Sequence, residues 1–214
     1  MIEYADDVFL IIILFALFGF IHSVLASDKI KKIFIERYES LIAFYRLFYV
    51  LSSLVIFYLI FQSLPKPRIT IYDLPQPFDF IILIPQFLSL AGIIWTFKYF
   101  SVQEFLGTAQ IFRWLNKEYD ISELDERLTL KIEGPYKLCR HPIYLFTILF
   151  LFFRPEMDLF YLTSLICIIA YFYIGSVYEE KKLVKRFGDN YINYQKSIPM
   201  IFPVKLKRYN PNSG

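Results

Sequence analysis

Two groups of polar residues stand at the edges of apolar runs in the C-terminal half of the chain. Arg140, His141 and Pro142 directly precede one apolar run, "IYLFTILFLFF" at 143–153, and Glu179 and Glu180 directly follow the next run, at 159–178. Ionisable groups within or near a membrane are costly, usually face a cavity and are candidates for function. These five residues are therefore the first candidates for a site.

The charges at this candidate site indicate the kind of ligand. A helix that begins at Pro142 presents free N–H groups and the positive end of its dipole to an anion. The two glutamates, Glu179 and Glu180, favour a cation, so a ligand that carries both charges fits; S-adenosylmethionine carries a carboxylate, an ammonium and a sulfonium. A plainer interpretation fits the same residues: Arg140 extends its head group to water, His141 caps a loop and "EEKK" is a solvated helix end.

The composition predicts what elements position these residues. The chain of 214 residues is 57% hydrophobic and 20% aromatic, and its mean hydropathy is +0.45, which is too apolar for an ordinary soluble domain. A membrane helix needs roughly 20 apolar residues, and four runs meet this length, at 8–26, 44–64, 80–100 and 159–178. A shorter run at 143–153 lies between Pro142 and Pro155. We therefore expect an all-α integral membrane protein with about five transmembrane helices in one membrane domain over 1–214.

The connections between these runs are also informative. The short helix at 143–153 and the helix at 159–178 should form a hairpin that turns at "RPEMD", and the proline-rich stretch 65–77 should be an extended loop. Lys and Arg gather in 27–43, in 101–141 and in the helical tail after 178, whereas the N-terminus before Val8 has none. Positive-inside bias then places the N-terminus outside and the tail in the cytoplasm. The basic loops are explained as topology signals, so we expect no nucleic-acid partner.

Helix lengths predict a recess at the candidate site. At 1.5 Å per residue the short helix is about 20 Å long and its partner about 30 Å. Measured from their shared outer turn, His141 lies below the cytoplasmic membrane surface, while Glu179 and Glu180 lie near it. The two helices thus outline a polar pocket.

Two longer sequence patterns resemble a known group of enzymes. "GPYKLCRHPIY" at 134–144 and "EEKKLVKRFGDNYINYQKSIPMIFP" at 179–203 resemble the C-terminal signature of the membrane methyltransferases that include isoprenylcysteine carboxyl methyltransferases and phospholipid N-methyltransferases. This signature region covers 128–203. Upstream, "HSVLASDKIKK", "YRLFYVLSS" and "FLGTAQ" look like the NnrU-like subgroup, and "RPEM" with "IPMIFP" looks like its methanethiol S-methyltransferase members.

The resemblance implies S-adenosylmethionine as the methyl donor and assigns residues to it. It places Glu179 nearer the acceptor and Glu180 nearer the ammonium of the donor. The residues implied to line the donor are Tyr136, His141, Pro142, Ile143 and Tyr144, with backbone contacts from Leu128, Thr129, Leu130 and Lys131. One departure concerns the acceptor: carboxyl methyltransferases carry an Arg one helical turn before the double glutamate, where this chain has Gly175. A carboxylate acceptor is therefore in doubt.

Arg140, His141 and Glu179 are the candidates for catalysis. Transfer of a methyl group from a sulfonium to an anion neutralises two charges, which a dry cavity of low dielectric constant favours. A thiol acceptor needs only modest stabilisation of its thiolate, by Arg140 or Arg46. An amine acceptor needs a base, for which His141 or Glu179 would serve.

Two polar residues of the N-terminal half are candidate substrate residues. His22, near the end of the first run, either bonds a neighbouring carbonyl or lines the acceptor pocket. Arg46, just inside the second run, must pair with another group or extend to water. The two histidines lie far apart in the sequence, so we expect no metal. Cys139 and Cys167 are expected to be small, inert residues without a disulfide.

Two interpretations from different classes remain. The first is a membrane S-adenosylmethionine-dependent methyltransferase that acts on a small thiol or on a lipid-soluble acceptor. Isoprenylcysteine and a phospholipid are the alternative acceptors. The second is a non-enzymatic NnrU-like accessory protein. Retention of both polar groups, at 140–142 and at 179–180, favours the enzyme. No G-x-G-x-x-G loop supports a nicotinamide cofactor.

Overall fold

The computed structural model describes residues 4–124, 127 and 129–204. The chain divides into two compact units. Unit 1 comprises 1–66 and 101–129, and unit 2 comprises 67–100 and 130–214. Leu128, which the resemblance placed beside the methyl donor, lies outside the described residues.

Unit 1 is built around two long apolar helices. These are α1 (Ala5–Leu25) and α3 (Tyr45–Ser63), which pack against each other. Shorter helical segments complete the unit: α2 (Asp28–Tyr38), η2 (Glu39–Phe44), α5 (Val102–Leu106), α6 (Thr108–Leu115) and η3 (Ile121–Glu123). Ser27 caps α2, because its hydroxyl accepts the backbone N–H of Ile30 at 3.4 Å. The buried core gathers Ile42, Tyr45 and Tyr49 from η2 and α3.

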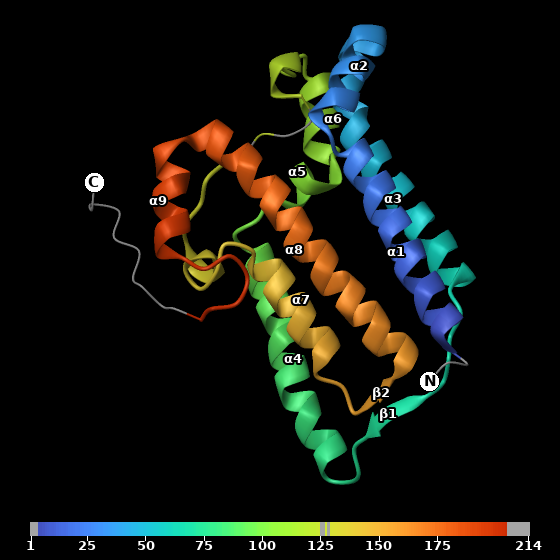
Figure 1. Cartoon of the computed structure of the whole chain (residues 1–214). Coiled ribbons are helices and arrows are strands. Elements are labelled where there is room, and N and C mark those ends of the chain that lie inside the picture. The colour runs from blue at the N-terminus through green and yellow to red at the C-terminus, as the bar shows by residue number, and fades with distance from the viewer. Residues whose placement is uncertain (1–3, 125–126, 128, 205–214) are drawn as a thin grey trace. The chain divides into compact units, whose positions relative to one another are not determined.

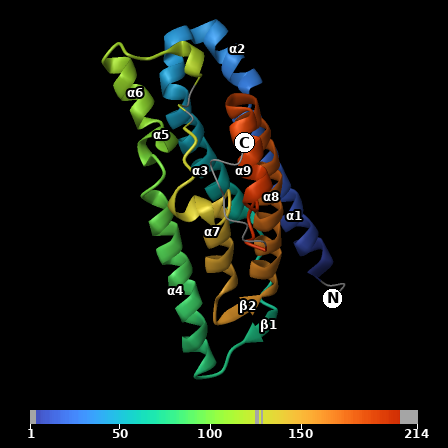
Figure 2. The same cartoon turned by 90° about the vertical axis from the view of Figure 1, so that its left-hand side faces the viewer.

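Unit 2 holds the remaining helices. Its elements are β1 (Thr70–Asp73), α4 (Phe78–Phe97), η4 (Gly134–Lys137), α7 (Pro142–Phe152), β2 (Glu156–Asp158), α8 (Leu159–Phe187) and α9 (Asp189–Ser197). The short helix α7 packs against both α4 and α8 and lies between them (Figures 1 and 2). α8 ends at Phe187, and after Gly188 the chain folds back as α9 beside it (Figure 1).

The α4–α7 contact depends on a glycine. A Cβ atom added to Gly92 would lie 2.4 Å from the ring of Phe146, so no larger residue fits without displacing that ring. Gln86 adds a polar contact, because its side-chain amide donates to the carbonyl of Phe150 at 3.2 Å. Small residues that allow close approach, with an occasional interhelical hydrogen bond, are typical of helix packing in membranes.

The proline-rich segment before α4 and the turn between α7 and α8 form a small sheet that the sequence did not predict. β1 and β2 pair in antiparallel fashion, with Thr70 opposite Asp158 and Asp73 opposite Glu156. The "RPEMD" turn is thus partly a strand, and the proline-rich loop is extended, as expected. Pairing occurs because the prolines leave these extended segments with free backbone groups, and unpaired backbone groups are costly.

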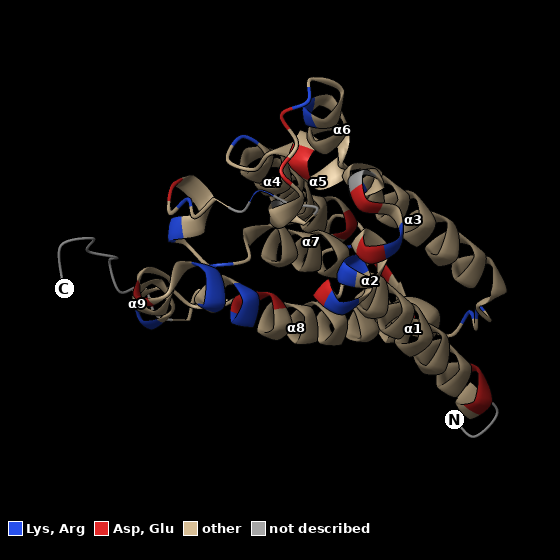
Figure 3. Ribbon diagram, turned by 90° about the horizontal axis from the view of Figure 1, so that it is seen from above, with Lys and Arg blue, Asp and Glu red and all other residues tan. Residues whose placement is uncertain are grey.

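The architecture is that of an all-α membrane protein. Four described helices are long and apolar enough to cross a bilayer, at Ala5–Leu25, Leu41–Ser63, Phe78–Phe97 and Leu159–Phe187, and Pro142–Phe152 is a shorter apolar helix. These confirm the helix positions expected from the apolar runs. On α8 the charged residues gather at the C-terminal end and leave the remainder of the helix without charge (Figure 3). The single membrane domain and the outside N-terminus stay predictions.

Candidate functional site

A buried ion pair joins the loop before α7 to the end of α8. The guanidinium of Arg140 donates from Nε to Glu180 Oε1 at 2.6 Å and from Nη2 to Oε2 at 2.9 Å. The two side chains are 9% and 8% exposed. Such a fork-to-fork pair fixes the orientation of both groups.

The remaining donor of this arginine reaches α9. Arg140 Nη1 donates to the carbonyl of Gln195 at 3.1 Å and also to that of Ile198. These carbonyls lie at the C-terminal end of α9, where the helix dipole favours a cation. Arg140 therefore fastens the end of α9 as well as Glu180.

The segment after α9 forms a wall of the site through its backbone. The N–H of Arg140 donates to the carbonyl of Pro199 at 2.9 Å, and the N–H of His141 donates to that of Met200 at 3.0 Å. Below this contact, Cys139, Leu145, Ile148 and Ile201 form a buried cluster. The polar loop is thus held on one side by a peptide segment and on the other by apolar packing.

His141 lies between two carboxylates. Its Nε2 is 3.2 Å from Glu180 Oε1 and its Nδ1 is 3.7 Å from Glu179 Oε2. The imidazole stacks on the ring of Tyr144 with centroids 5.2 Å apart, and that ring stacks on Phe172 at 4.3 Å. Both ring nitrogens and one face of this buried histidine are therefore fixed by neighbours.

The two adjacent glutamates have different environments. Consecutive helical residues point roughly 100° apart, so Glu180 points into the packed site while Glu179 points to its edge. The side chain of Glu179 is 50% exposed, and its closest hydrogen-bond donor, the hydroxyl of Tyr144, lies at 3.4 Å. Glu179 is the carboxylate of this site that remains open to a ligand.

The segment before the loop depends on another glycine. Gly134 has a φ of +54°, and a Cβ at this position would lie 2.4 Å from the ring of Tyr99. After it, the carbonyl of Tyr136 accepts the hydroxyl of Tyr194 at 2.6 Å. Burial, with a contribution from the charge of Glu179, raises the pKa of the Tyr136 hydroxyl to about 12. The "G-x-Y" of the sequence pattern is therefore a tight turn that places Tyr136 between α4 and α9.

The other residues predicted to bind the donor have varied surroundings. Pro142 is the buried first residue of α7, as expected, and Ile143 is half-buried behind it. Leu130 packs against the cluster of Tyr191, Tyr194 and Ile198, whereas Lys131 is exposed. Thr129 is exposed and belongs to unit 1.

The candidate substrate residues His22 and Arg46 lie in unit 1. His22 Nδ1 is 2.9 Å from the hydroxyl of Ser53, and its Nε2 contacts the hydroxyl of Tyr49. Arg46 donates from Nε to the carbonyl of Phe105 at 3.0 Å, and its guanidinium lies 5.5 Å from the ring centres of both Tyr49 and Phe105. The His22 ring therefore contacts two side chains of α3, which the sequence did not predict.

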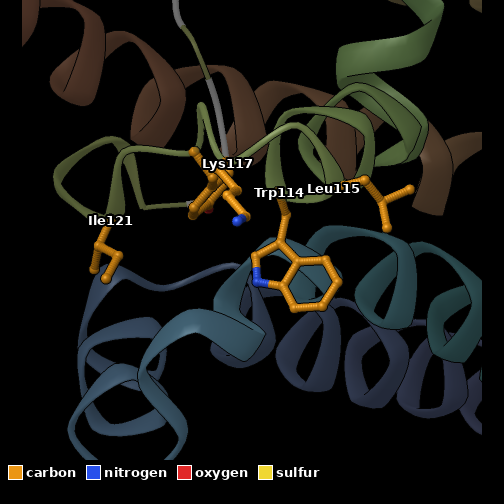
Figure 4. A pocket seen from close by; sticks show the side chains of 5 residues that line it. Trp114, Leu115, Lys117 and Ile121 are labelled. Atoms are coloured by element: carbon orange, nitrogen blue, oxygen red, sulfur yellow. The ribbon is translucent and has the colours of Figure 1, made fainter.

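Each unit contains a hollow that His141 does not line. One, of about 410 Å³ in unit 1, is lined by Trp114, Leu115, Lys117, Tyr119 and Ile121 (Figure 4). The other, of about 220 Å³ in unit 2, is lined by Ile169, Tyr173, Met200, Ile201 and Phe202. Among the described residues no group of three His, Cys, Asp or Glu side chains could hold a metal ion.

Three features of the site had little signal in the sequence. The folded tail brings Gln195 to Glu180 and to Arg140, and it brings the carbonyls of Pro199 and Met200 to the backbone of the polar loop. A glutamine next to a motif tyrosine looks like any polar residue of a solvated helix. Only its position one residue after Tyr194, on the helix that follows the double glutamate, hinted at a role.

Comparisons with known proteins identify relatives of this chain. No family model and no solved structure matches the chain. The methanethiol S-methyltransferase 1 of Bradyrhizobium diazoefficiens is 30% identical over 205 residues, which are 93% of this chain and 68% of that protein. The methanethiol S-methyltransferase of Pseudomonas deceptionensis is 29% identical over 203 residues, 94% of this chain and 74% of that protein. That of Mycobacterium tuberculosis is 25% identical over 194 residues, 90% of this chain and 76% of that protein.

These matches cover 90–94% of this chain. The chain therefore belongs to the family of the methanethiol S-methyltransferases.

Proposed function

We propose that this protein is a membrane methyltransferase that uses S-adenosylmethionine to methylate a small thiol such as methanethiol. The names of its relatives support the reaction and the acceptor. The single structural observation that carries the proposal is the half-exposed carboxylate of Glu179 beside the buried imidazole of His141. We also propose, from the distribution of Lys and Arg between the apolar runs, that the N-terminus lies outside and the C-terminus in the cytoplasm.

The residues present fit a donor that carries both charges. The first turn of α7 begins at Pro142, and the N-terminus of a helix presents the positive end of its dipole, which suits a carboxylate. Glu179, at the edge of the site, suits an ammonium or a sulfonium. Arg140 and Glu180 neutralise each other and add no net charge to the site.

The roles of the residues follow from these positions. When bound, S-adenosylmethionine supplies an electrophilic methyl group. Methylation of a thiol breaks the bond between the donor sulfur and its methyl group, forms a thioether, releases S-adenosylhomocysteine and frees one proton, which the half-exposed carboxylate of Glu179 would accept. His141 holds that carboxylate in place from its Nδ1 side, and the stacked rings of Tyr144 and Phe172 exclude water from the imidazole. Arg140 is a positioning residue in this scheme.

The test combines binding with product formation. Calorimetry should detect S-adenosylmethionine binding by detergent-purified protein, and gas chromatography of the headspace should detect dimethyl sulfide made from methanethiol. We expect Glu179→Gln to lower kcat on the order of 10²-fold, the usual effect of removing a general base.

Glu156→Gln is the matched control, because Glu156 is an exposed glutamate on β2 of the same unit. It should leave kcat unchanged. A folded wild-type protein that binds no S-adenosylmethionine would refute the proposal and would favour the accessory protein considered from the sequence.

A further inference from the structure

We propose that Gln195, which no sequence pattern assigned, is a positioning residue that holds Glu180 and, through it, the imidazole of His141. This inference rests on the proposed function only for its effect on methyl-donor binding. Its structural part concerns the orientation of His141 and is tested separately.

The first argument is the double contact that Gln195 makes with the ion pair. Its side-chain amide donates to Glu180 Oε2 at 2.7 Å, and its backbone carbonyl accepts Arg140 Nη1 at 3.1 Å. One residue of α9 thus touches both members of the pair. The short distance to Oε2 is typical of a hydrogen bond to a charged acceptor.

The second argument is a count of donors around Glu180. An ionised carboxylate has about four lone-pair directions on its two oxygens. Oε1 meets Arg140 Nε and His141 Nε2, and Oε2 meets Arg140 Nη2 and Gln195 Nε2. The carboxylate is fully used, so its rotation is blocked from both sides. Among the described residues, the side-chain amide of Gln195 makes one hydrogen bond, and it goes to Glu180.

The third argument links Glu180 to the open edge of the site. His141 contacts Glu180 at 3.2 Å and Glu179 at 3.7 Å from opposite ring nitrogens. A carboxylate that rotates at Glu180 therefore turns the imidazole and changes its distance to Glu179. Displacements of about 1 Å in a catalytic arrangement are enough to reduce rates strongly.

The experiment uses two variants and a control on the same helix. Gln195→Met keeps the length of the side chain and removes the amide, and Gln195→Glu places a second carboxylate against Glu180. Asn193→Leu removes an amide from the exposed face of α9. Thermal unfolding of each variant establishes that it is folded, and Gln195→Asn, which draws the amide back by one methylene, replaces Gln195→Glu if that variant does not fold.

The first readout is spectroscopic and independent of the methyl donor. The chain contains two histidines, so ¹⁵N-histidine labelling gives ring signals from His141 and His22 alone. We expect the His141 signals to move in Gln195→Met and Gln195→Glu, while those of His22, in unit 1, keep their positions. Asn193→Leu should move neither.

The second readout is calorimetric binding of S-adenosylmethionine. Gln195 acts on the donor only through Glu180 and His141, and substitutions that act through other residues typically change binding by roughly two- to thirty-fold. We therefore expect the Kd to rise on the order of ten-fold in Gln195→Met and further in Gln195→Glu. Unmoved His141 signals in both folded variants would overturn the inference. Moved signals with no binding by the wild type would uphold the positioning role and refute the proposed function instead.

Discussion

The ion pair of Arg140 and Glu180 leads to a quantitative prediction about stability. Arg140→Met and Glu180→Met each remove one charge and leave the other buried. Because both side chains are almost fully buried, solvent cannot compensate for the loss. The partner left behind keeps only part of its hydrogen bonds.

The expected magnitude follows from the contacts. Each single variant loses the two charge-assisted hydrogen bonds that join the pair, in addition to its bonds with other groups, and each bond of this kind contributes about 1.5–3 kcal/mol. Breaking a buried pair by removing one partner usually costs about 3–5 kcal/mol, and we expect each variant to lose about 3 kcal/mol of unfolding free energy because neighbouring donors and carbonyls satisfy part of the remaining charge. Replacing both residues removes both buried charges, so the double variant should also lose only about 3 kcal/mol instead of the sum of about 6.

The assay is a double-mutant cycle on unfolding in mixed detergent and SDS micelles, followed by circular dichroism. Burial predicts that the coupling energy of about 3 kcal/mol changes little with salt, because buried pairs are screened weakly. Two results would refute this reasoning: single variants within about 1 kcal/mol of the wild type, or a double variant that loses the full sum. Either would mean that the pair is solvated or that its members act independently.

Other predictions concern single positions. Gly134→Ala should lower the unfolding free energy by about 1–3 kcal/mol or more, the usual cost of a strained backbone, because φ is positive and the new methyl group meets the ring of Tyr99. Gly175→Ala on α8 should instead raise the unfolding free energy by about 0.5–1 kcal/mol, because the new methyl group meets nothing within 4 Å. Thermal unfolding of the two variants compares these effects. Burial raises the pKa of the Cys139 thiol to about 12, so in a Cys167→Ala background only on the order of 10⁻⁴ of it is thiolate at pH 8, against about a quarter for a free thiol. Alkylation by iodoacetamide should therefore be slow and should accelerate as the pH rises, and rapid labelling at pH 8 would show that the thiol is accessible and ionised.

Much of the helical framework could be predicted from the sequence. The apolar runs at 8–26, 44–64 and 80–100 coincide with helices to within a few residues, since the bilayer sets the length of a spanning helix and composition reveals it. Pro142 begins α7 as expected, because proline at the first helical position loses no hydrogen bond. The helix that starts at Leu159 runs on to Phe187, beyond the apolar stretch, because its charged last turns pack against α9.

The sequence could not show which of Glu179 and Glu180 is buried and which stays exposed. Both follow the same apolar run, and the resemblance gave both to ligands. The structure shows Glu180 used by Arg140, His141 and Gln195, whereas Glu179 keeps a half-exposed carboxylate. Helix geometry makes adjacent residues diverge, but which of the two points inward depends on where α9 packs.

What the sequence alone determined about this protein is therefore local: apolar length, helix ends at proline, and polar residues that a membrane protein keeps only for a reason. The tertiary structure decided which polar groups meet. Arg140 and Glu180 are 40 residues apart, and Arg140 and the carbonyl of Ile198 are 58 apart. Such contacts depend on how α8 and α9 fold back on the loop before α7, and local periodicity and composition carry no information about the partner that a distant segment brings.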